Sequence, residues 1–259
     1  MTSLTPPPGR DLLAGKVVLV TAAAGTGIGN ATARRCLEEG ATVVLSDAHE
    51  RRLGEAADEL TELAGGTRPT SFLCDVTVEE DVQAMVDGTV AAHGRLDVLV
   101  NNAGLGGTAE LVEMTDEQWT KVLDVTLTGT MRVTRAALRH MYGADGGVIV
   151  NNASVLGWRA QAGQSHYAAA KAGVMALTRC AAIEAAPHGV RINAVAPSLA
   201  MHPFLAKVTS DEVLDVLTRR EAFGRAAEPW EVATVIAFLA SDYSTYMTGE
   251  VVSVSSQRA

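Results

Sequence analysis

Short runs of apolar and β-branched residues alternate with longer amphipathic stretches along nearly all of the 259-residue chain. The short runs predict seven strands, at residues 17–21, 42–46, 71–74, 98–100, 148–151, 191–195 and 251–254. Helices are predicted between them, at residues 28–39, 51–63, 78–92, 116–141, 165–186 and 228–240. Because several strands are apolar on both faces and helices connect them, we predict an α/β fold with a doubly wound parallel sheet of about seven strands, flanked by helices.

No linker rich in Pro, Gly or Ser divides the chain, so a single domain over residues 1–259 is predicted. Residues 1–12 contain a run of three prolines and are expected to form a flexible arm. Residues 198–224 follow the sixth predicted strand and break the alternation, with a helix of their own near 211–220. Since ligands bind beyond the carboxyl ends of strands in open α/β sheets, we expect this insertion to contact the substrate.

The composition excludes several classes of partner. The chain has 21 Lys and Arg against 30 Asp and Glu, and its net charge of -9 argues against nucleic acid, which needs a basic surface. Its three cysteines are scattered, which favours free thiols in a reducing compartment. No segment reads as a signal peptide or a membrane span, and the histidines lack metal-ligand spacing. A cytoplasmic protein without membrane or metal is predicted.

A glycine-rich turn joins the first predicted strand to the first predicted helix. It consists of Gly25, Thr26, Gly27, Ile28 and Gly29. Backbone N–H groups at such a turn, together with the helix N-terminus, can bind a pyrophosphate. Asp47 follows the second strand, where a carboxylate accepts hydrogen bonds from the adenosine ribose and repels a 2′-phosphate. The pattern predicts a dinucleotide site that favours NAD over NADP.

Tyr167 and Lys171 lie one helical turn apart in the predicted helix 165–186. A free tyrosine has a pKa near about 10 and is a poor base at neutral pH. A lysine ammonium on the same helix face favours the tyrosinate and lowers that pKa, which suits the proton transfer that accompanies hydride transfer. Ser154 follows the fifth predicted strand, so it is delivered at the carboxyl end of the sheet.

These elements, with Asn101-Asn102-Ala103-Gly104 after the fourth strand, resemble the short-chain dehydrogenase/reductase family over nearly the whole chain. The resemblance implies a single-domain Rossmann enzyme that moves a hydride between a nicotinamide cofactor and an alcohol or ketone. It implies that Tyr167 is the general acid and base. It further implies that Lys171 binds the nicotinamide ribose and that Ser154 donates a hydrogen bond to the substrate oxygen.

The resemblance also assigns the remaining cofactor contacts. They are Asp75 and Val76 for the adenine, the turn Asn102, Ala103 and Gly104 beneath the cofactor, and Pro197 and Ala200 near the nicotinamide. Two of the departures from the family pattern concern the phosphate loop and the proton relay. Ala22 replaces the first glycine of a loop that is one residue longer, and Thr126 replaces an asparagine that often holds a water in a proton relay to the lysine. Thr126 is therefore a candidate catalytic residue, with its relay role open.

Four stretches, residues 21–29, 150–161, 221–233 and 248–256, resemble actinobacterial family members linked to degradation of the steroid C/D-ring (hydrindane) remnant as a CoA thioester. The resemblance implies a small-molecule substrate, a secondary alcohol or ketone on a bulky skeleton. Candidates for binding the negative charge of CoA are Arg159, Lys207, Arg219 and Arg220.

The family resemblance also implies a homotetramer, formed through helices 116–141 and 165–186 and through the last helix and strand. Three alternatives stay open at this point. The enzyme could reduce 3-oxoacyl (fatty-acyl) thioesters or oxidise a sugar or polyol. A cofactor-binding sensor or scaffold without activity is the third.

Overall fold

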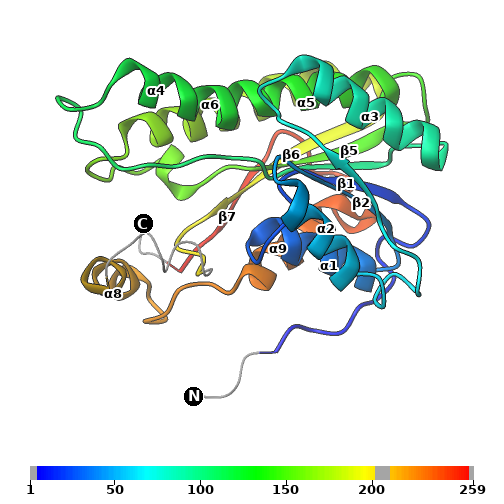
Figure 1. Cartoon of the computed structure of the whole chain (residues 1–259), viewed down its shortest axis with the longest axis horizontal. Helices are drawn as coiled ribbons and strands as arrows, with labels where there is room; N and C mark the ends of the chain where they lie inside the picture. The colour runs from blue at the N-terminus through cyan, green and yellow to red at the C-terminus, as the bar shows by residue number, and fades with distance from the viewer. Residues whose placement is uncertain (1–4, 202–210, 257–259) are drawn as a thin grey trace.

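The computed structural model describes residues 5–201 and 211–256 as one seven-stranded sheet between two layers of helices (Figure 1). The strands lie in the order β3-β2-β1-β4-β5-β6-β7, and every neighbouring pair is parallel. Their bounds are β1 Val17–Val20, β2 Thr42–Asp47, β3 Thr70–Leu73, β4 Val98–Asn101, β5 Gly147–Asn152, β6 Val190–Pro197 and β7 Val251–Val254. The predicted doubly wound parallel sheet is confirmed.

Two groups of helices cover the two faces of the sheet (Figure 1). One layer contains α1 (Ile28–Glu38), α2 (Glu50–Glu59) and α9 (Pro229–Ala240). The other contains α3 (Glu79–His93), α4 (Asp116–Leu123), α5 (Gly129–Met141) and α6 (Ser165–Ala185). Helix α8 (Asp211–Arg220), from the predicted insertion, stands apart from both layers.

The central strand β1 is apolar at every position because both of its faces are covered. Val18 and Val20 pack with residues of α1 and α9. Val17 and Leu19 point the other way and pack with residues of α3 and α5. Successive side chains of a strand point to opposite faces, so one four-residue run contributes to two cores.

The predicted helix 116–141 is not one continuous α-helix. Its start is confirmed, since Thr115 and Gln118 form a capping box at α4. A π-helical segment at Asp124–Thr128 then separates α4 from α5. Such segments frequently occur at functional sites, and this one carries the buried Thr126.

The sequence Thr77-Val78-Glu79-Glu80 has the pattern of a capped helix start and predicts Thr77 as the N-cap of the helix at residues 78–92, but this prediction is wrong. The N-cap of α3 is Val78, and no side chain caps it. The Thr77 hydroxyl instead donates to the Asp75 carboxylate (2.7 Å), which also accepts the Thr77 N–H (2.9 Å). Donation to this carboxylate holds the Thr77 hydroxyl beside Asp75, and it accepts no hydrogen bond from the first-turn N–H groups of α3.

The segment before β1 runs against α1. The backbone N–H groups of Arg10 and Leu12 donate to the buried Glu39 carboxylate, at 2.7 and 3.1 Å. Arg35 pairs with Glu39 and donates to the Pro7 carbonyl. Residues 1–4 of the expected arm and 202–210 of the expected insertion lie outside the described residues. Flexibility of the arm stays a prediction.

No helix in the described part of the chain is long and apolar enough to cross a membrane. Across the same residues, no group of three or more His, Cys, Asp or Glu side chains is arranged to hold a metal ion.

Candidate active site and cofactor-binding cleft

The turn between β1 and α1 depends on two residues with positive φ. Gly25 has φ +83°, and Ala22 has φ +49°. Left-handed backbone is unfavourable for a residue with a Cβ, which explains in physical terms why family members place glycine where this chain has Ala22. The Ala22 carbonyl accepts a hydrogen bond from Asn102 Nδ2 (3.1 Å), and this bond joins the glycine turn to the end of β4.

Gly27 and Gly29 have different roles in the same turn. A Cβ on Gly29 would overlap the Ala22 carbonyl oxygen and lie 2.5 Å from Asn102 Nδ2, so this position requires glycine for packing. A Cβ on Gly27 would meet nothing within 4 Å. Gly27 is also the N-cap of α1, and no side chain accepts from the first-turn N–H groups. Open space beside uncapped amides fits a pyrophosphate anion.

Asp47 stands at the end of β2 beside this turn. Its carboxylate accepts the backbone N–H of Ala24 (3.2 Å) and of His49 (2.9 Å). Burial raises the pKa of Asp47, and the hydrogen bond from Ala24 opposes that rise. Each carboxylate oxygen retains a further lone pair, so the group can also accept ribose hydroxyls. Its position fits the predicted adenosine site.

Asp75 and Val76 follow β3, at the adenosine end of the predicted site. The Asp75 side chain is exposed, and it holds the Thr77 turn described above. Val76 is buried, and its side chain fills the space where a Cβ on Gly129 would lie. Each of the two residues therefore has a structural role, in addition to the adenine contact that the sequence predicts.

Buried asparagines connect the ends of β4 and β5. Asn101 and Asn151 are register partners, and Asn101 Nδ2 donates to Asn151 Oδ1 (2.9 Å). Asn151 Nδ2 continues to Thr178 Oγ1 on α6 (2.9 Å). One residue further, Asn152 Nδ2 donates to Asn102 Oδ1 (2.9 Å). This network fixes the Asn102-Ala103-Gly104 turn, whose Ala103 N–H donates to Thr21 Oγ1 (3.0 Å).

The three predicted catalytic residues come together beyond the end of β5. Ser154 is 8% exposed, and its hydroxyl accepts the Leu156 N–H (3.2 Å). The Tyr167 side chain is hydrogen-bonded to Ser154. Lys171 Nζ lies 5.6 Å from the centroid of the Tyr167 ring and donates to the Asn152 carbonyl (2.6 Å). Sequence reasoning missed Asn152, although consecutive asparagines end both β4 and β5.

Burial dominates the electrostatics of this group. It raises the pKa of Tyr167, while the hydrogen bond from Ser154 opposes the rise. Burial also lowers the pKa of Lys171 to about 8. The lysine is therefore mostly protonated at neutral pH and loses its proton in mildly alkaline solution. Lowering of the Tyr167 pKa by Lys171 stays a prediction, because burial and Ser154 are the two causes seen here.

Thr126 lies near Lys171 but is bound to the backbone of Leu105. Its hydroxyl donates to the Leu105 carbonyl (3.1 Å) and accepts the Leu105 N–H (2.9 Å). A Cβ on Gly104 would lie 3.4 Å from Lys171 Nζ and 3.7 Å from Thr126 Oγ1, which places both groups around this glycine. Because the only donor of Thr126 is engaged, the hydroxyl can accept a hydrogen bond from water but cannot donate one.

The chain after β6 is held by a buried glutamate that sequence reasoning did not single out. Pro197 ends β6, and Ala200 forms an isolated parallel bridge with Ala227. The Glu221 carboxylate accepts the hydroxyls of Ser198 (3.1 Å) and Ser256 (2.8 Å). Glu221 therefore fixes the start of the insertion against the chain end, whereas the candidate Lys207 lies outside the described residues.

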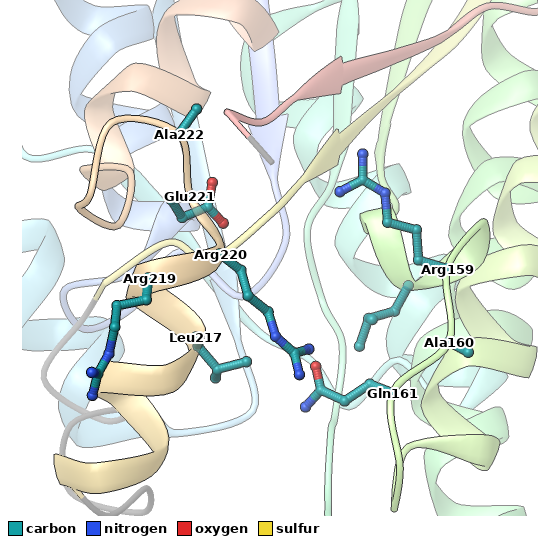
Figure 2. A pocket seen from close by; sticks show the side chains of 9 residues that line it. Arg159, Ala160, Gln161, Leu217, Arg219, Arg220, Glu221 and Ala222 are labelled. Carbon is teal, nitrogen blue, oxygen red and sulfur yellow. The ribbon is translucent and has the colours of Figure 1, made fainter. Parts of the chain in front are cut away.

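A cavity of about 590 Å³ lies near Ser154, and its wall includes Leu156, two residues later in the chain. Three predicted arginines line it, Arg159 from the loop after β5 and Arg219 and Arg220 from the end of α8. Figure 2 shows the Arg220 guanidinium turned into the space toward Gln161, whereas Arg219 points away. The other lining residues are Leu156, Ala160, Leu217, Glu221 and Ala222.

Comparison with known proteins agrees with this geometry. A family model described as enoyl-(acyl carrier protein) reductase matches residues 22–256. The chain is 69% identical to "(5R,7aS)-5-hydroxy-7a-methyl-1-oxo-2,3,5,6,7,7a-hexahydro-1H-indene-carboxyl-CoA reductase" of Mycobacterium tuberculosis, over 96% of this chain and 95% of the relative. It is 43% identical to a cis-4-hydroxycyclohexanecarboxylate dehydrogenase of Sinomonas cyclohexanicum, over 94% and 96%.

Solved structures give the same fold. A short-chain dehydrogenase from Mycobacterium smegmatis is 66% identical, with a TM-score of 0.88 over 99% of this chain and 98% of that one. Carveol dehydrogenase from Mycobacterium avium, in complex with NAD, is 30% identical, with a TM-score of 0.87 over 95% and 98%.

Proposed function

The chain belongs to the short-chain dehydrogenase/reductase family of oxidoreductases, and we propose that it interconverts a ring secondary alcohol and its ketone with NAD(H). The observation that carries the reaction is the meeting of Tyr167, Ser154 and Lys171 beyond the end of β5. A hydrogen-bonded phenol and hydroxyl beside a buried ammonium are the groups that proton transfer at an alcohol oxygen requires.

Each side chain has a distinct part in the proposed reaction. The bound nicotinamide would supply or accept the hydride. Tyr167 would hold or release the proton of the alcohol oxygen, and Ser154 would hydrogen-bond that oxygen as charge develops. Lys171, held by the Asn152 carbonyl, would favour the tyrosinate and bind the nicotinamide ribose. Thr126 would position Leu105 and Gly104 around Lys171 and accept a hydrogen bond from a relay water.

We assign the adenosine half of the cofactor to Gly25–Gly29 and Asp47, with NAD preferred. The Asp47 carboxylate is 9% exposed and fixed by two backbone N–H groups. Placing a 2′-phosphate against a buried carboxylate costs more than the contacts return. Arg51 is already paired with Glu55 (2.6 Å). The positive charge of Arg52 lowers the pKa of Asp47 and so favours its ionised form.

We propose a carboxyl-CoA thioester of a bulky bicyclic skeleton as the substrate. The Mycobacterium tuberculosis relative is named for a hydroxylated hydrindene carboxyl-CoA, and the Sinomonas relative for a hydroxycyclohexane carboxylate. Both names describe a ring hydroxyl and a carboxyl function on one skeleton. The cavity beside Ser154, at about 590 Å³, is within the range that pockets for such ligands occupy.

The test compares kcat/KM for four substrates with NAD⁺. They are a bicyclic hydroxyacyl-CoA, its free acid, a linear 3-hydroxyacyl-CoA and a polyol. The bicyclic thioester should be the best substrate. Preference for the linear thioester would favour a 3-oxoacyl reductase, and preference for the polyol would favour sugar chemistry. Cofactor binding without turnover of any substrate would favour a sensor.

We further propose a cytoplasmic homotetramer. Ile183, on the helix α6 where tetramer contacts were predicted, is 77% exposed, and Tyr246, in the segment that joins the predicted last helix and strand, is fully exposed. The three cysteines are free thiols, as suits a reducing compartment. Burial raises the pKa of Cys36 and Cys74 to about 12, which makes these two thiols unreactive. Light scattering at micromolar concentration should give four subunits, and a monomer would contradict the assembly.

A further inference from the structure

The cavity beside the candidate active site has a wall built for an anion. We propose that Arg220, with Gln161 opposite it, binds the phosphates of the CoA part of the substrate. This inference rests on the proposed thioester substrate and adds the residues that would recognise its carrier. Guanidinium groups present planar sets of N–H donors that match phosphate oxygens, and an amide adds two more donors.

Adjacent arginines at the end of α8 differ in what they contact. Arg219 forms an ion pair with Asp215 one turn earlier (3.6 Å) and also donates to the Asp215 carbonyl (3.3 Å). Figure 2 shows its side chain leading away from the cavity. Arg220 has no ion-pair partner among the residues that the structure describes, and its guanidinium reaches toward the Gln161 amide. Arg219 is therefore paired with Asp215, whereas the positive charge of Arg220 points into the cavity.

Glu221, the carboxylate in the cavity wall, forms no salt bridge with Arg220 in the described part of the chain. Glu221 is 4% exposed, and its oxygens accept the hydroxyls of Ser198 and Ser256 and the Leu199 N–H. Its charge therefore holds the chain after β6. In a protein with a net charge of -9, an arginine that points into a cavity and has no carboxylate partner among residues 5–201 and 211–256 favours a local site for an anionic ligand.

The position of Arg220 favours the CoA tail over the acyl carboxylate of a free acid. Leu156 lies at the catalytic end of the cavity, two residues from Ser154, and Leu217 adds an apolar surface. Arg220 is exposed to solvent, so it lies where a long substituent would leave the protein. A ring carboxylate stays close to the reacting carbon, whereas the diphosphate and 3′-phosphate of CoA extend well beyond it.

The experiment uses two matched variants, Arg220→Ala and Arg219→Ala, which remove the same charge from adjacent positions. The probes are the CoA thioester of cis-4-hydroxycyclohexanecarboxylate, its pantetheine thioester without phosphates, and the free acid. Arg220→Ala should raise the KM for the CoA thioester roughly tenfold with kcat unchanged, because a charge-assisted hydrogen bond is lost. The pantetheine thioester should be unaffected, and Arg219→Ala should stay within about twofold of the parent enzyme for every probe.

Salt and direct binding give independent readouts. Raising the salt from about 50 to about 200 mM should raise the KM for the CoA thioester in the parent more than in Arg220→Ala, because ions screen the phosphates. Calorimetry with free CoA, at saturating NAD⁺ so that the dinucleotide site is filled, should show roughly tenfold weaker binding to Arg220→Ala. This measurement tests the phosphate site even if no thioester is turned over. Absence of turnover would refute the proposed substrate but not the phosphate site.

Four results would overturn the phosphate site. The first is an equal rise in KM for the pantetheine and CoA thioesters, which would mean that Arg220 contacts the acyl part. The second is an equal effect of Arg219→Ala, which would reduce the effect to general charge. The third is a selective loss with the free acid, which would make the ligand a carboxylate. Turnover of both thioesters with equal KM in the parent would remove the site but retain the proposed substrate class.

Discussion

Alanine at Gly27 and at Gly29 should separate the binding role of the glycine turn from its packing role. At Gly29 the new Cβ would overlap the Ala22 carbonyl and displace Asn102 Nδ2. Overpacking costs about 1–3 kcal/mol, and the lost Asn102–Ala22 hydrogen bond adds about 1 kcal/mol. Gly29→Ala should therefore lose about 2–4 kcal/mol of folding free energy, which lowers the Tm by roughly 5–12 °C for a chain of this size.

Gly27→Ala should leave the cofactor-free protein almost unchanged. Gly27 has φ -91°, which alanine adopts without strain, and its Cβ would meet nothing within 4 Å. Exchanging glycine for alanine at an N-cap costs roughly 0.5 kcal/mol. The same methyl group would occupy the space proposed for the pyrophosphate, so cofactor affinity should fall at least about tenfold.

Thermal unfolding with and without NADH measures both effects. At about one hundred times its Kd, a ligand stabilises the parent by about 2.7 kcal/mol, which is a shift of roughly 5–10 °C. Gly27→Ala should match the parent Tm without NADH and lose most of the shift. Gly29→Ala should begin from a lower Tm. A full NADH shift in Gly27→Ala, or equal destabilisation of both variants, would refute this account of the turn.

Four further predictions concern the proposed catalytic and cofactor groups. Tyr167→Phe should reduce kcat by at least about a thousandfold with NADH affinity within about threefold, because only the hydroxyl is lost; near-parental kcat would exclude Tyr167 from the reaction. Asp47→Ala should weaken kcat/KM for NADH about ten- to a hundredfold and improve NADPH, and unchanged preference would contradict the NAD assignment. The pKa of Lys171 is about 8 in the folded protein and ordinarily 10.5, so between these pH values the unfolded chain binds the proton more strongly. The free energy of unfolding of the parent, relative to Lys171→Met, should therefore rise from pH 8 to pH 10.5. A difference that does not change with pH would argue against a lowered pKa. Thr126→Ala should lower both Tm and kcat by freeing Leu105, whereas Thr126→Ser should retain them; parental behaviour of Thr126→Ala at every pH would remove both the positioning role and the relay.

The sequence predicts the sheet well because each strand carries its own signal. Residues 17–20 are apolar at all four positions, as expected for a strand that is covered by helices on both faces. The same reasoning cannot detect the π-helical segment at Asp124–Thr128, since its residues continue the periodicity of a long helix. It also misplaced the cap of α3, because Thr77 has a competing acceptor in Asp75 that only the folded turn brings within reach.

The proposed pair of Tyr167 and Lys171 could be found from the sequence because its spacing is local, whereas its supporting contacts are not local. Tyr167 and Lys171 are one helical turn apart, but the carbonyl that holds Lys171 belongs to Asn152 on another element. The parallel register could have indicated this contact, because Asn101 is the register partner of Asn151 and each is followed by a second asparagine. Glu221 offered no such signal, because the hydroxyls that it holds lie 23 and 35 residues away in sequence.

The two sides of the cleft rest on separate supports, and this separation assigns chemistry and substrate choice to different parts of the chain. Lys171 is held by the Asn152 carbonyl, next to the buried pair Asn101 and Asn151 at the ends of β4 and β5. Arg220 ends α8, and the next residue, Glu221, accepts the hydroxyl of Ser198 just after β6. Disturbing an asparagine should therefore change kcat for every substrate alike. Disturbing the Glu221 contacts should instead change KM selectively for substrates that extend along the cavity, because the reacting groups keep their own support.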